Sequence, residues 1–331
     1  MDRGVGKIAA RLRRGDEVRV VSPATSLGFI PEDQRETAAE RLARLGLKTT
    51  YSKNGEILDR FDSAPVEARV SDLHDAFSDP EVAGMLTTLG GYNSNQLLGH
   101  LDYDLIRDNP KILCGFSDIT ALATAIYTKV GLVTYSGPHF STFSMVHGIE
   151  YTLEHFERCL MREGPYEVEP ADHWSDDPWY ADQENREFVP NSGYRVINEG
   201  EAGGKLLGGH LGTFCLLFGT AFMPDLEGSI LLIECDEETR PEHLARELQA
   251  LIFQPGFEGV RALVIGHFQR ASQVDPDTLD SIVGGKPELA GIPVVADASF
   301  GHTTPQFTFP IGGRGRLEAR HGAVRFVIEE H

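Results

Sequence analysis

Up to about residue 135, short apolar runs alternate with longer segments in which apolar and polar residues repeat at helical spacing. The runs have the length of buried strands, and the segments between them are typical of amphipathic helices. Strands that alternate with helices predict a parallel sheet with helices on both faces. The predicted strands cover 17–23, 48–52, 84–91, 111–116 and 131–137, and the clearest helices cover 31–46 and 66–77.

The alternation stops after residue 165, in a segment rich in Pro, Asp, Glu and Asn that carries both tryptophans, Trp174 and Trp179. This composition is typical of a connection rather than of a packed element. We therefore predict an N-terminal α/β domain over 1–165, a linker and substrate loop over 166–200, and a smaller C-terminal α/β domain over 201–331.

Beyond residue 200, a Gly-rich stretch precedes a second series of apolar runs and amphipathic segments. The last residues alternate around His321-Gly322, which predicts a hairpin turning at that pair. The second domain is thus expected to be α/β with a mixed sheet. Its predicted strands cover 229–235, 259–268 and 292–298, and its predicted helices cover 242–253 and 276–283.

The net charge of the chain indicates which classes of binding partner to expect. The 331 residues include 30 basic and 50 acidic ones, for a formal net charge of −20. Such a surface repels nucleic-acid phosphates and anionic lipid headgroups, so neither a nucleic-acid polymer nor a membrane is expected as a partner. A small anionic ligand stays compatible, because the potential inside a pocket need not follow the net charge.

Neither a signal peptide nor a membrane-spanning segment is predicted. The pattern contains no apolar stretch of membrane-spanning length and no apolar core of signal-peptide type near residue 1. The four cysteines are widely spaced, and they are expected as buried thiols in a reducing compartment. The expected location is therefore the cytoplasm.

The stretch KILCGFSDITALATAIY, which begins at Lys111, joins a predicted strand directly to a predicted helix. Ser117 and Asp118 lie at the junction, where Ser and Asp are ordinary helix N-caps. A serine on such a turn is also placed to attack, and the N–H groups that open the helix suit an anion. The Gly-x-Ser-x-Gly elbow is absent, because Ile119 occupies its fifth position. Both interpretations of Ser117 stay open on this stretch alone.

Two further stretches complement Ser117. In LGGYNSNQLL, Gly90 and Gly91 follow a predicted strand and allow the backbone to approach a ligand closely. In FGHTTPQFTFPIGG, His302 follows the predicted strand 292–298 and suits a general base. Glu234 ends the apolar run SILLI and is the candidate that orients this base, although three more acidic residues crowd the same strand end. Ligands bind at the carboxyl ends of the strands in parallel sheets.

The sequence does not match the common nucleotide-binding or metal-binding motifs. LGGYNSN does not match Gly-x-Gly-x-x-Gly, and VGGKPE lacks the first Gly of a phosphate loop and has Pro287 in place of its Ser or Thr. The 12 histidines are scattered, without a His-Glu-x-x-His motif. Neither a metal ion nor an organic cofactor is therefore expected.

Taken in order, GGYNSNxLL, GFSDITAL, YSGP, a Glu that ends an apolar strand, and GHTTPxxxxPIG resemble the LD-carboxypeptidase family of serine peptidases. The resemblance extends from about Val18 to about Gly313. It implies a parallel α/β N-terminal domain, a smaller C-terminal domain, and a homodimer.

The resemblance also implies chemical roles. Ser117 corresponds to the nucleophile, His302 to the base, and Glu234 to the residue that orients the base. Backbone N–H groups near Gly91 and at Asp118 correspond to the oxyanion hole. The reaction implied is amide hydrolysis through an acyl-enzyme, with the triad divided between the two domains.

The substrate is less closely defined. Muropeptide-recycling members usually carry an Arg in the glycine loop, whereas this chain reads Asn93-Ser94-Asn95, which resembles the branch of microcin C self-immunity proteins. These cleave a carboxamide between an aminoacyl group and a modified nucleotide, so a peptidyl- or aminoacyl-nucleotide is the expected substrate. A cell-wall muropeptide is the alternative within enzymes. A non-catalytic small-molecule binding protein on the same frame is the alternative outside them.

Several side chains are candidates for holding the substrate. The tryptophans of the acidic segment are expected either to fix a long loop to the body or to form an aromatic wall over the nucleotide end of the substrate. His210, in GGHLGTF, is expected to cap or pack, or to line the pocket. Asp118 is expected to cap its helix, with chemistry only through its N–H. The full candidate set is Gly90, Tyr92, Asn93, Trp174, Trp179 and His210.

Overall fold

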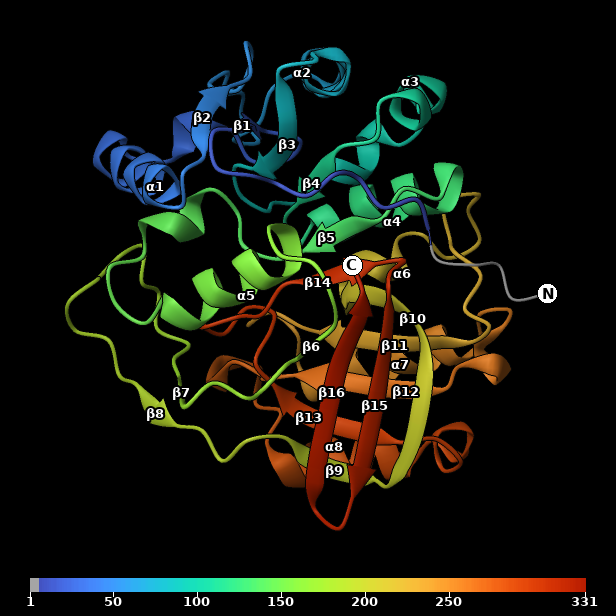
Figure 1. Ribbon diagram of the computed structural model, residues 1–331. Helices are drawn as coiled ribbons and strands as arrows, with labels where there is room; N and C mark the ends of the chain where they lie inside the picture. The colour runs from blue at the N-terminus through green and yellow to red at the C-terminus, as the bar shows by residue number, and fades with distance from the viewer. Residues whose placement is uncertain (1–5) are drawn as a thin grey trace.

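The structure, a computed structural model, describes residues 6–331, so residues 1–5 at the start of the expected N-terminal domain lie outside the described part. Two sheets lie one above the other in Figure 1, with the first half of the chain around the upper sheet and the second half around the lower one. This is the mixed α/β, two-part architecture that the hydrophobic pattern predicts, and the fold class is confirmed.

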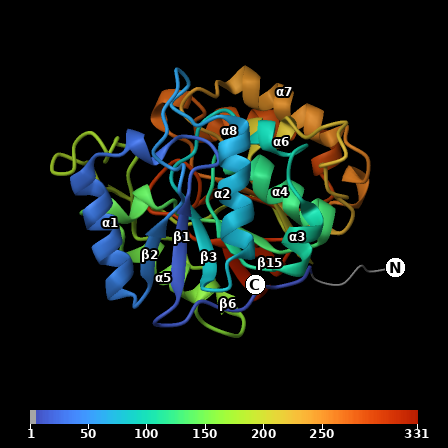
Figure 2. The ribbon, with the colours of Figure 1, turned by 90° about the horizontal axis from the view of Figure 1, so that it is seen from above.

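The upper sheet has the strand order β14-β5-β4-β3-β1-β2. Strands β2, β1, β3, β4 and β5 are parallel, and β14 pairs with β5 in the antiparallel direction. Helices α1 and α5 lie on one side of the sheet and α2, α3 and α4 on the other, as both views show (Figures 1 and 2). The bounds are β1 Glu17–Val21, α1 Glu32–Arg44, β2 Lys48–Tyr51, α2 Val66–Ser78, β3 Val82–Thr87, α3 Tyr103–Asp108, β4 Ile112–Cys114, α4 Ile119–Val130, β5 Thr134–Ser136, α5 Glu150–Leu160 and β14 Phe309–Ile311.

The lower sheet has the order β6-β16-β15-β10-β11-β12-β13-β9. Its centre, from β10 to β13, is parallel, and its margins are antiparallel, which makes it the mixed sheet that was predicted. The closing hairpin turns at His321 and Gly322, with φ of 53° and 76°, as the sequence indicates. The bounds are β10 Gly200–His210, α6 Leu211–Cys215, β11 Ser229–Glu234, α7 Pro241–Ile252, β12 Ala262–Gly266, α8 Pro276–Gly284, β13 Val294–Ala298, β15 Arg314–Arg320 and β16 Ala323–Glu330.

The Gly-rich stretch after residue 200 forms the long strand β10, where only a Gly-rich start was predicted. Its glycines allow the neighbouring backbones to approach. A Cβ on Gly204 would lie 2.3 Å from the carbonyl oxygen of Gly228, and one on Gly208 would lie 2.0 Å from that of Leu232. Glycine is therefore required here by the packing of β10 against β11.

The segment predicted as a linker is partly built into the lower sheet. Its first strand, β6 (Tyr166–Glu167), pairs with β16, and its last, β9 (Arg195–Asn198), pairs with β13. Between them, β7 (His173–Trp174) and β8 (Val189–Pro190) form a two-stranded ribbon. The predicted domain limits at 165 and 200 stay predictions.

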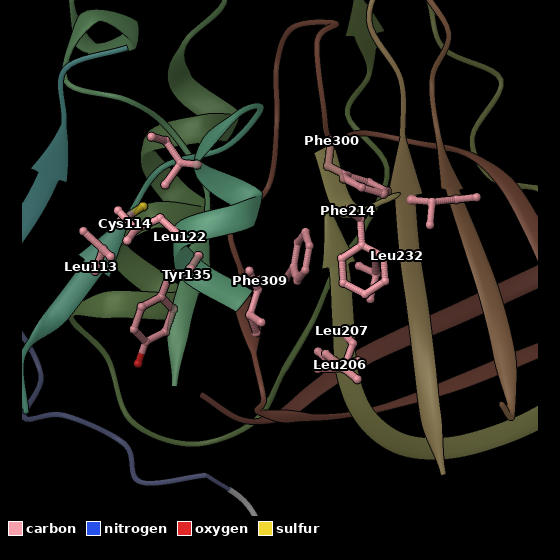
Figure 3. Close-up of a cluster of buried hydrophobic side chains, with 14 of the residues drawn as sticks. Leu113, Cys114, Leu122, Tyr135, Leu206, Leu207, Phe214, Leu232, Phe300 and Phe309 are labelled. Carbon is pink, nitrogen blue, oxygen red and sulfur yellow. The ribbon is translucent and has the colours of Figure 1, made fainter. Parts of the chain in front are cut away.

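One hydrophobic core joins the two halves. Figure 3 shows Cys114, Leu122 and Tyr135 on the side of the upper sheet, and Leu207, Phe214 and Leu232 on the side of the lower sheet. Phe309, on β14, lies between the two groups in the same view. Because all of these side chains belong to one buried cluster, the carboxyl ends of β4 and β11 are held in a fixed relation.

The cysteines are free throughout the described residues, and three of the four are buried as predicted. Cys215, on the short helix α6, is only half-buried, and this part of the prediction is wrong. Within residues 6–331, no helix combines the length and the apolar character needed to cross a bilayer.

Candidate functional site

Three side chains from the two halves of the molecule form a hydrogen-bonded chain. Ser117 Oγ lies 2.9 Å from His302 Nε2, and His302 Nδ1 lies 2.7 Å from Glu234 Oε2. Ser117 follows β4, Glu234 ends β11, and His302 lies in the connection from β13 to β14. The arrangement has the geometry of a nucleophile, a base and a carboxylate that orients the base.

Ser117 lies on a tight turn between β4 and α4. Its φ is 59°, a left-handed conformation that is uncommon for residues other than glycine. The N-cap of α4 is Asp118, so the interpretation of Ser117 as a simple N-cap is wrong. The turn instead presents the hydroxyl group to His302.

Glu234 is 2% exposed, and it is the acid of its crowded strand end that reaches His302. Burial alone would raise the pKa of Glu234, but the charge of His302 and its hydrogen bond hold that pKa below its usual value. Burial likewise opposes protonation of His302, yet the charge of Glu234 and the same hydrogen bond raise the pKa of His302 above its usual value. The pair therefore favours a proton on the imidazole.

Gly301 makes room for this pair. Its φ is 100°, and a Cβ on it would lie 2.6 Å from Glu234 Oε2. A glycine directly before His302 is therefore required by the approach of the carboxylate.

Gly90 and Gly91 follow β3 and lie beside Ser117. A Cβ on Gly90 would lie 3.0 Å from Ser117 Cβ and 3.1 Å from Ser117 Oγ, so the missing side chain lets the glycine loop approach the nucleophile closely. Gly91 has a φ of 146°, and a Cβ on it would lie 2.8 Å from Thr25 Oγ1. Both glycines line the cleft with Ser117 and Asp118. The assignment of backbone N–H groups near Gly91 and at Asp118 to an oxyanion hole stays a prediction.

The Asp118 side chain does not cap its helix, so the expected capping role is wrong. Its carboxylate instead accepts hydrogen bonds from the backbone N–H groups of Asn93 (3.0 Å) and Ser94 (2.8 Å). Asn93 directs its side-chain oxygen to Arg69, which donates to it at 2.9 Å, and it is not among the residues that line the cleft. These contacts tie the glycine loop to the turn that carries Ser117.

Tyr92 and His210 both line the cleft. Tyr92 is 79% exposed, and its hydroxyl group donates to Glu238 at 3.3 Å. His210 Nδ1 accepts from the N–H of Thr213 and so caps α6, while its Nε2 lies 3.5 Å from Asp236 Oδ2. The capping role expected for His210 is thus present together with a position on the wall of the cleft.

The two tryptophans lie in different environments. Trp179 lines the cleft and makes an edge contact with Tyr180, with ring centroids 5.8 Å apart. Trp174, on β7, stacks on His267 with centroids 5.3 Å apart and is not among the lining residues. Trp179 therefore lies at the site, whereas Trp174 packs outside the cleft, where it joins its loop to His267.

The cleft has a volume of about 1150 Å³, which accommodates a substrate larger than a single amino acid. Among the described residues that line it there is no Lys or Arg. Its charged groups are carboxylates, which belong to Asp118, Asp176, Asp177, Asp236, Glu237, Glu238 and Glu247. The lining therefore carries seven acidic side chains and no lysine or arginine among its described residues.

His139, which was not predicted as a site residue, directly follows the YSGP motif and lines the cleft. Its ring stacks on Phe116, with centroids 4.3 Å apart, and Phe116 also contacts the ring of His302 at 5.4 Å. The motif places a histidine there, but a lone histidine after a proline has no recognisable spacing. Across residues 6–331, no group of three or more His, Cys, Asp or Glu side chains is arranged to hold a metal ion.

Two family models match the chain. The LD-carboxypeptidase N-terminal domain matches residues 18–137, and the LD-carboxypeptidase C-terminal domain matches residues 203–317. The first contains Ser117, and the second contains Glu234 and His302.

Individual proteins match over nearly the whole length. The putative carboxypeptidase YocD of Bacillus subtilis is 51% identical, over 98% of this chain and 99% of its own. The microcin C7 self-immunity protein MccF of Escherichia coli is 31% identical, over 92% of this chain and 91% of its own. The crystal structure of an MccF-like protein from Bacillus anthracis has a TM-score of 0.97 and 50% identity, and the match covers 98% of this chain and 100% of that one. A structure of MccF in complex with aspartyl sulfamoyl adenosine has a TM-score of 0.87 and 29% identity, over 98% of each chain.

Proposed function

Because this chain belongs to the LD-carboxypeptidase family, as its motifs indicated, we propose that it hydrolyses an amide bond through a serine acyl-enzyme. It is an enzyme of the hydrolase class, like the relatives that share both domains. The observation that carries the proposed mechanism is the hydrogen-bonded chain from Ser117 through His302 to Glu234.

In the proposed reaction, Ser117 Oγ attacks the carbonyl carbon while its proton passes to His302 Nε2. When the tetrahedral intermediate collapses, the C–N bond breaks and the leaving nitrogen takes that proton. Water then attacks the acyl-enzyme, with His302 again as the base, and Ser117 regains its proton. Glu234 holds the Nδ1–H side of the imidazole and stabilises its charged form.

The substrate we propose is an aminoacyl or peptidyl group joined through an amide to a modified nucleotide. Three observations support it. Trp179 and Tyr180 line the cleft and offer aromatic surface for a base, and a relative of the same fold binds aspartyl sulfamoyl adenosine. The Asn93-Ser94-Asn95 sequence in the glycine loop also departs from the Arg that muropeptide enzymes usually carry.

A substrate panel tests this proposal. The wild-type enzyme and Ser117→Ala are incubated with an aminoacyl-sulfamoyl adenosine and with murein tetrapeptide, and the products are measured by mass spectrometry. We expect cleavage of the first substrate, dependent on Ser117. Cleavage of the tetrapeptide alone would favour wall recycling, and cleavage of neither, with tight binding of either, would favour a non-catalytic binding protein.

The homodimer implied by the resemblance stays a prediction. Light scattering after size exclusion would measure twice the monomer mass of 36.4 kDa if it is correct.

A further inference from the structure

His139 is the buried histidine of the cleft to which the proposed mechanism gives no role. It follows β5, it is 1% exposed, and it lines the cleft together with Ser117. Its Nδ1 lies 2.7 Å from Thr87 Oγ1. Its Nε2 is buried and has no hydrogen-bond partner among the described residues. A buried polar atom without a hydrogen-bond partner costs folding free energy. An unpaired imidazole nitrogen in a substrate cleft is therefore a candidate for binding a ligand atom.

The contacts of Thr87 indicate which nitrogen carries the proton. The Thr87 hydroxyl oxygen lies 2.7 Å from His139 Nδ1 but 3.4 Å from the carbonyl oxygen of Cys114. The hydroxyl group has one proton, and we assign it to the shorter contact, which makes Nδ1 the acceptor. The imidazole proton then lies on Nε2, which becomes a donor.

Gly115 keeps this arrangement possible. A Cβ on Gly115 would lie 2.1 Å from Thr87 Oγ1 and would displace the hydroxyl group from its position beside His139. The glycine that precedes Phe116 and Ser117 therefore serves the contact between Thr87 and His139.

Gly90 indicates where the free Nε2–H can act. The point that a Cβ on Gly90 would occupy is 3.1 Å from Ser117 Oγ and 3.6 Å from His139 Nε2. The nucleophile and the unpaired nitrogen therefore both lie against the same point of the glycine loop. Ser117 and His139 also line the same cleft, so the ring of His139 borders the place where a substrate bound to Ser117 would lie.

The charge state of His139 suits a donor and not a base. Burial lowers its pKa to about 3, and the positive charge of His302 contributes in the same direction. A pKa this low keeps the imidazole neutral near neutral pH. The stack of its ring on Phe116 holds its plane fixed, which is the kind of preorganisation that stabilises developing charge.

We propose that His139 is a further catalytic residue, whose Nε2–H donates a hydrogen bond to the substrate oxygen that becomes negative when Ser117 attacks. The proposal rests on the proposed hydrolysis. It adds a neutral side-chain donor to the backbone N–H groups expected near Gly91 and at Asp118.

Steady-state kinetics of two variants test the role. His139→Phe keeps an aromatic ring but removes the donor, and we expect kcat to fall by about 100-fold or more, the scale for losing one oxyanion donor, with KM nearly unchanged. His139→Gln restores an N–H of similar reach and is expected to recover at least tenfold of that loss. The matched control is His155→Phe, because His155 is also buried and neutral, lies outside the cleft, and has an unpaired nitrogen. Its kcat is expected to stay within threefold of the wild-type value.

A kcat for folded His139→Phe within threefold of the wild-type value, while Ser117→Ala is inactive, overturns the role of His139 and leaves the proposed hydrolysis standing. An inactive wild-type enzyme overturns both.

A second measurement uses the wild-type enzyme, so it does not depend on whether a variant at position 139 folds. In ¹⁵N-histidine-labelled wild-type enzyme, NMR between pH 6 and pH 9 reports which nitrogen of His139 is protonated. We expect the proton on Nε2, and a shift of its resonance when Ser117 is modified by a fluorophosphonate. A proton on Nδ1, or an Nε2–H resonance that the modification leaves unchanged, overturns the proposal.

Discussion

At the scale of single residues, Ser117 is held in a conformation that its own chemistry does not favour. A non-glycine residue with a φ of 59° costs about 1–3 kcal/mol, and it persists only where the surroundings enforce it. The surroundings here are β4 on one side and α4 on the other, with Asp118 bonded to the glycine loop. The strain is thus balanced by contacts that also fix the position of the hydroxyl group.

The raised pKa of His302 predicts the pH dependence of the reaction. The imidazole accepts the proton of Ser117 only when it is neutral, so kcat/KM falls as the pH falls through the pKa of His302. Because Glu234 raises that pKa, the midpoint of the acidic limb is expected above the ~6.5 of free histidine. A profile measured from pH 5 to pH 9 in wild-type enzyme checks this.

Glu234→Gln removes the charge that raises the pKa, so its limb is expected at lower pH together with a smaller kcat. Asp297→Asn, a change of charge outside the cleft, is the control and is expected to keep the wild-type midpoint. A wild-type profile that is flat between pH 5 and pH 8 would speak against an imidazole base.

At the scale of elements, the segment that contains the ribbon of β7 and β8 places the two tryptophans in different environments. Trp179 lines the cleft, whereas Trp174 packs between His267 and the guanidinium group of Arg270, 5.5 Å from its ring. The first position allows contact with a substrate, and the second supports the loop.

Substitution of each tryptophan tests this division. Stacking of a base on an aromatic ring is worth about 1–3 kcal/mol, so Trp179→Ala is expected to raise KM for a nucleotide-linked substrate by roughly 5- to 150-fold. It should hardly change KM for a plain dipeptide amide. Trp174→Ala is expected to lower the melting temperature without that selectivity. Equal losses on both substrates in Trp179→Ala would indicate a structural loop, and no loss on either would remove Trp179 from the site.

Elements whose pattern is local were predicted from the sequence. The alternating runs locate β1 to β5 and β11 to β13 within a few residues, and helical spacing locates α1, α2, α7 and α8. Glu234 also came from local order, as the acid that ends the run SILLI.

Features that depend on distant partners were not predicted. The pairing of β14 with β5 joins segments more than 170 residues apart, and no local pattern specifies it. The bonds of Asp118 to the glycine loop and the contact of His139 with Thr87 have the same origin. Trp174 and Trp179 lie in one acidic segment, so their sequence context could not separate them.

At the scale of the whole molecule, the net charge of −20 continues into the cleft, which is lined by carboxylates and by no Lys or Arg among its described residues. A substrate with an acidic aminoacyl group meets repulsion there, and a cationic one meets attraction. The potential of the cleft therefore bears on which aminoacyl groups the enzyme accepts.

We predict that kcat/KM is about tenfold or more higher for a lysyl than for a glutamyl sulfamoyl adenosine. A tenfold ratio corresponds to a difference of about 1.4 kcal/mol in transition-state binding. An alanyl substrate should be intermediate. The difference should shrink at 1 M salt, where charges are screened over about 3 Å. Faster cleavage of the glutamyl substrate at low salt would contradict this prediction.

The proposed reaction depends on Ser117 as the nucleophile that His302 activates. Its most direct test is the intact mass of the protein after incubation with a fluorophosphonate probe at neutral pH. We predict a single adduct, located on Ser117 by peptide mapping, that is absent in Ser117→Ala and at least 100-fold slower to form in His302→Ala, while both variants melt near the wild-type temperature. An adduct on another residue, or equal labelling of folded Ser117→Ala, would show that Ser117 is not the nucleophile.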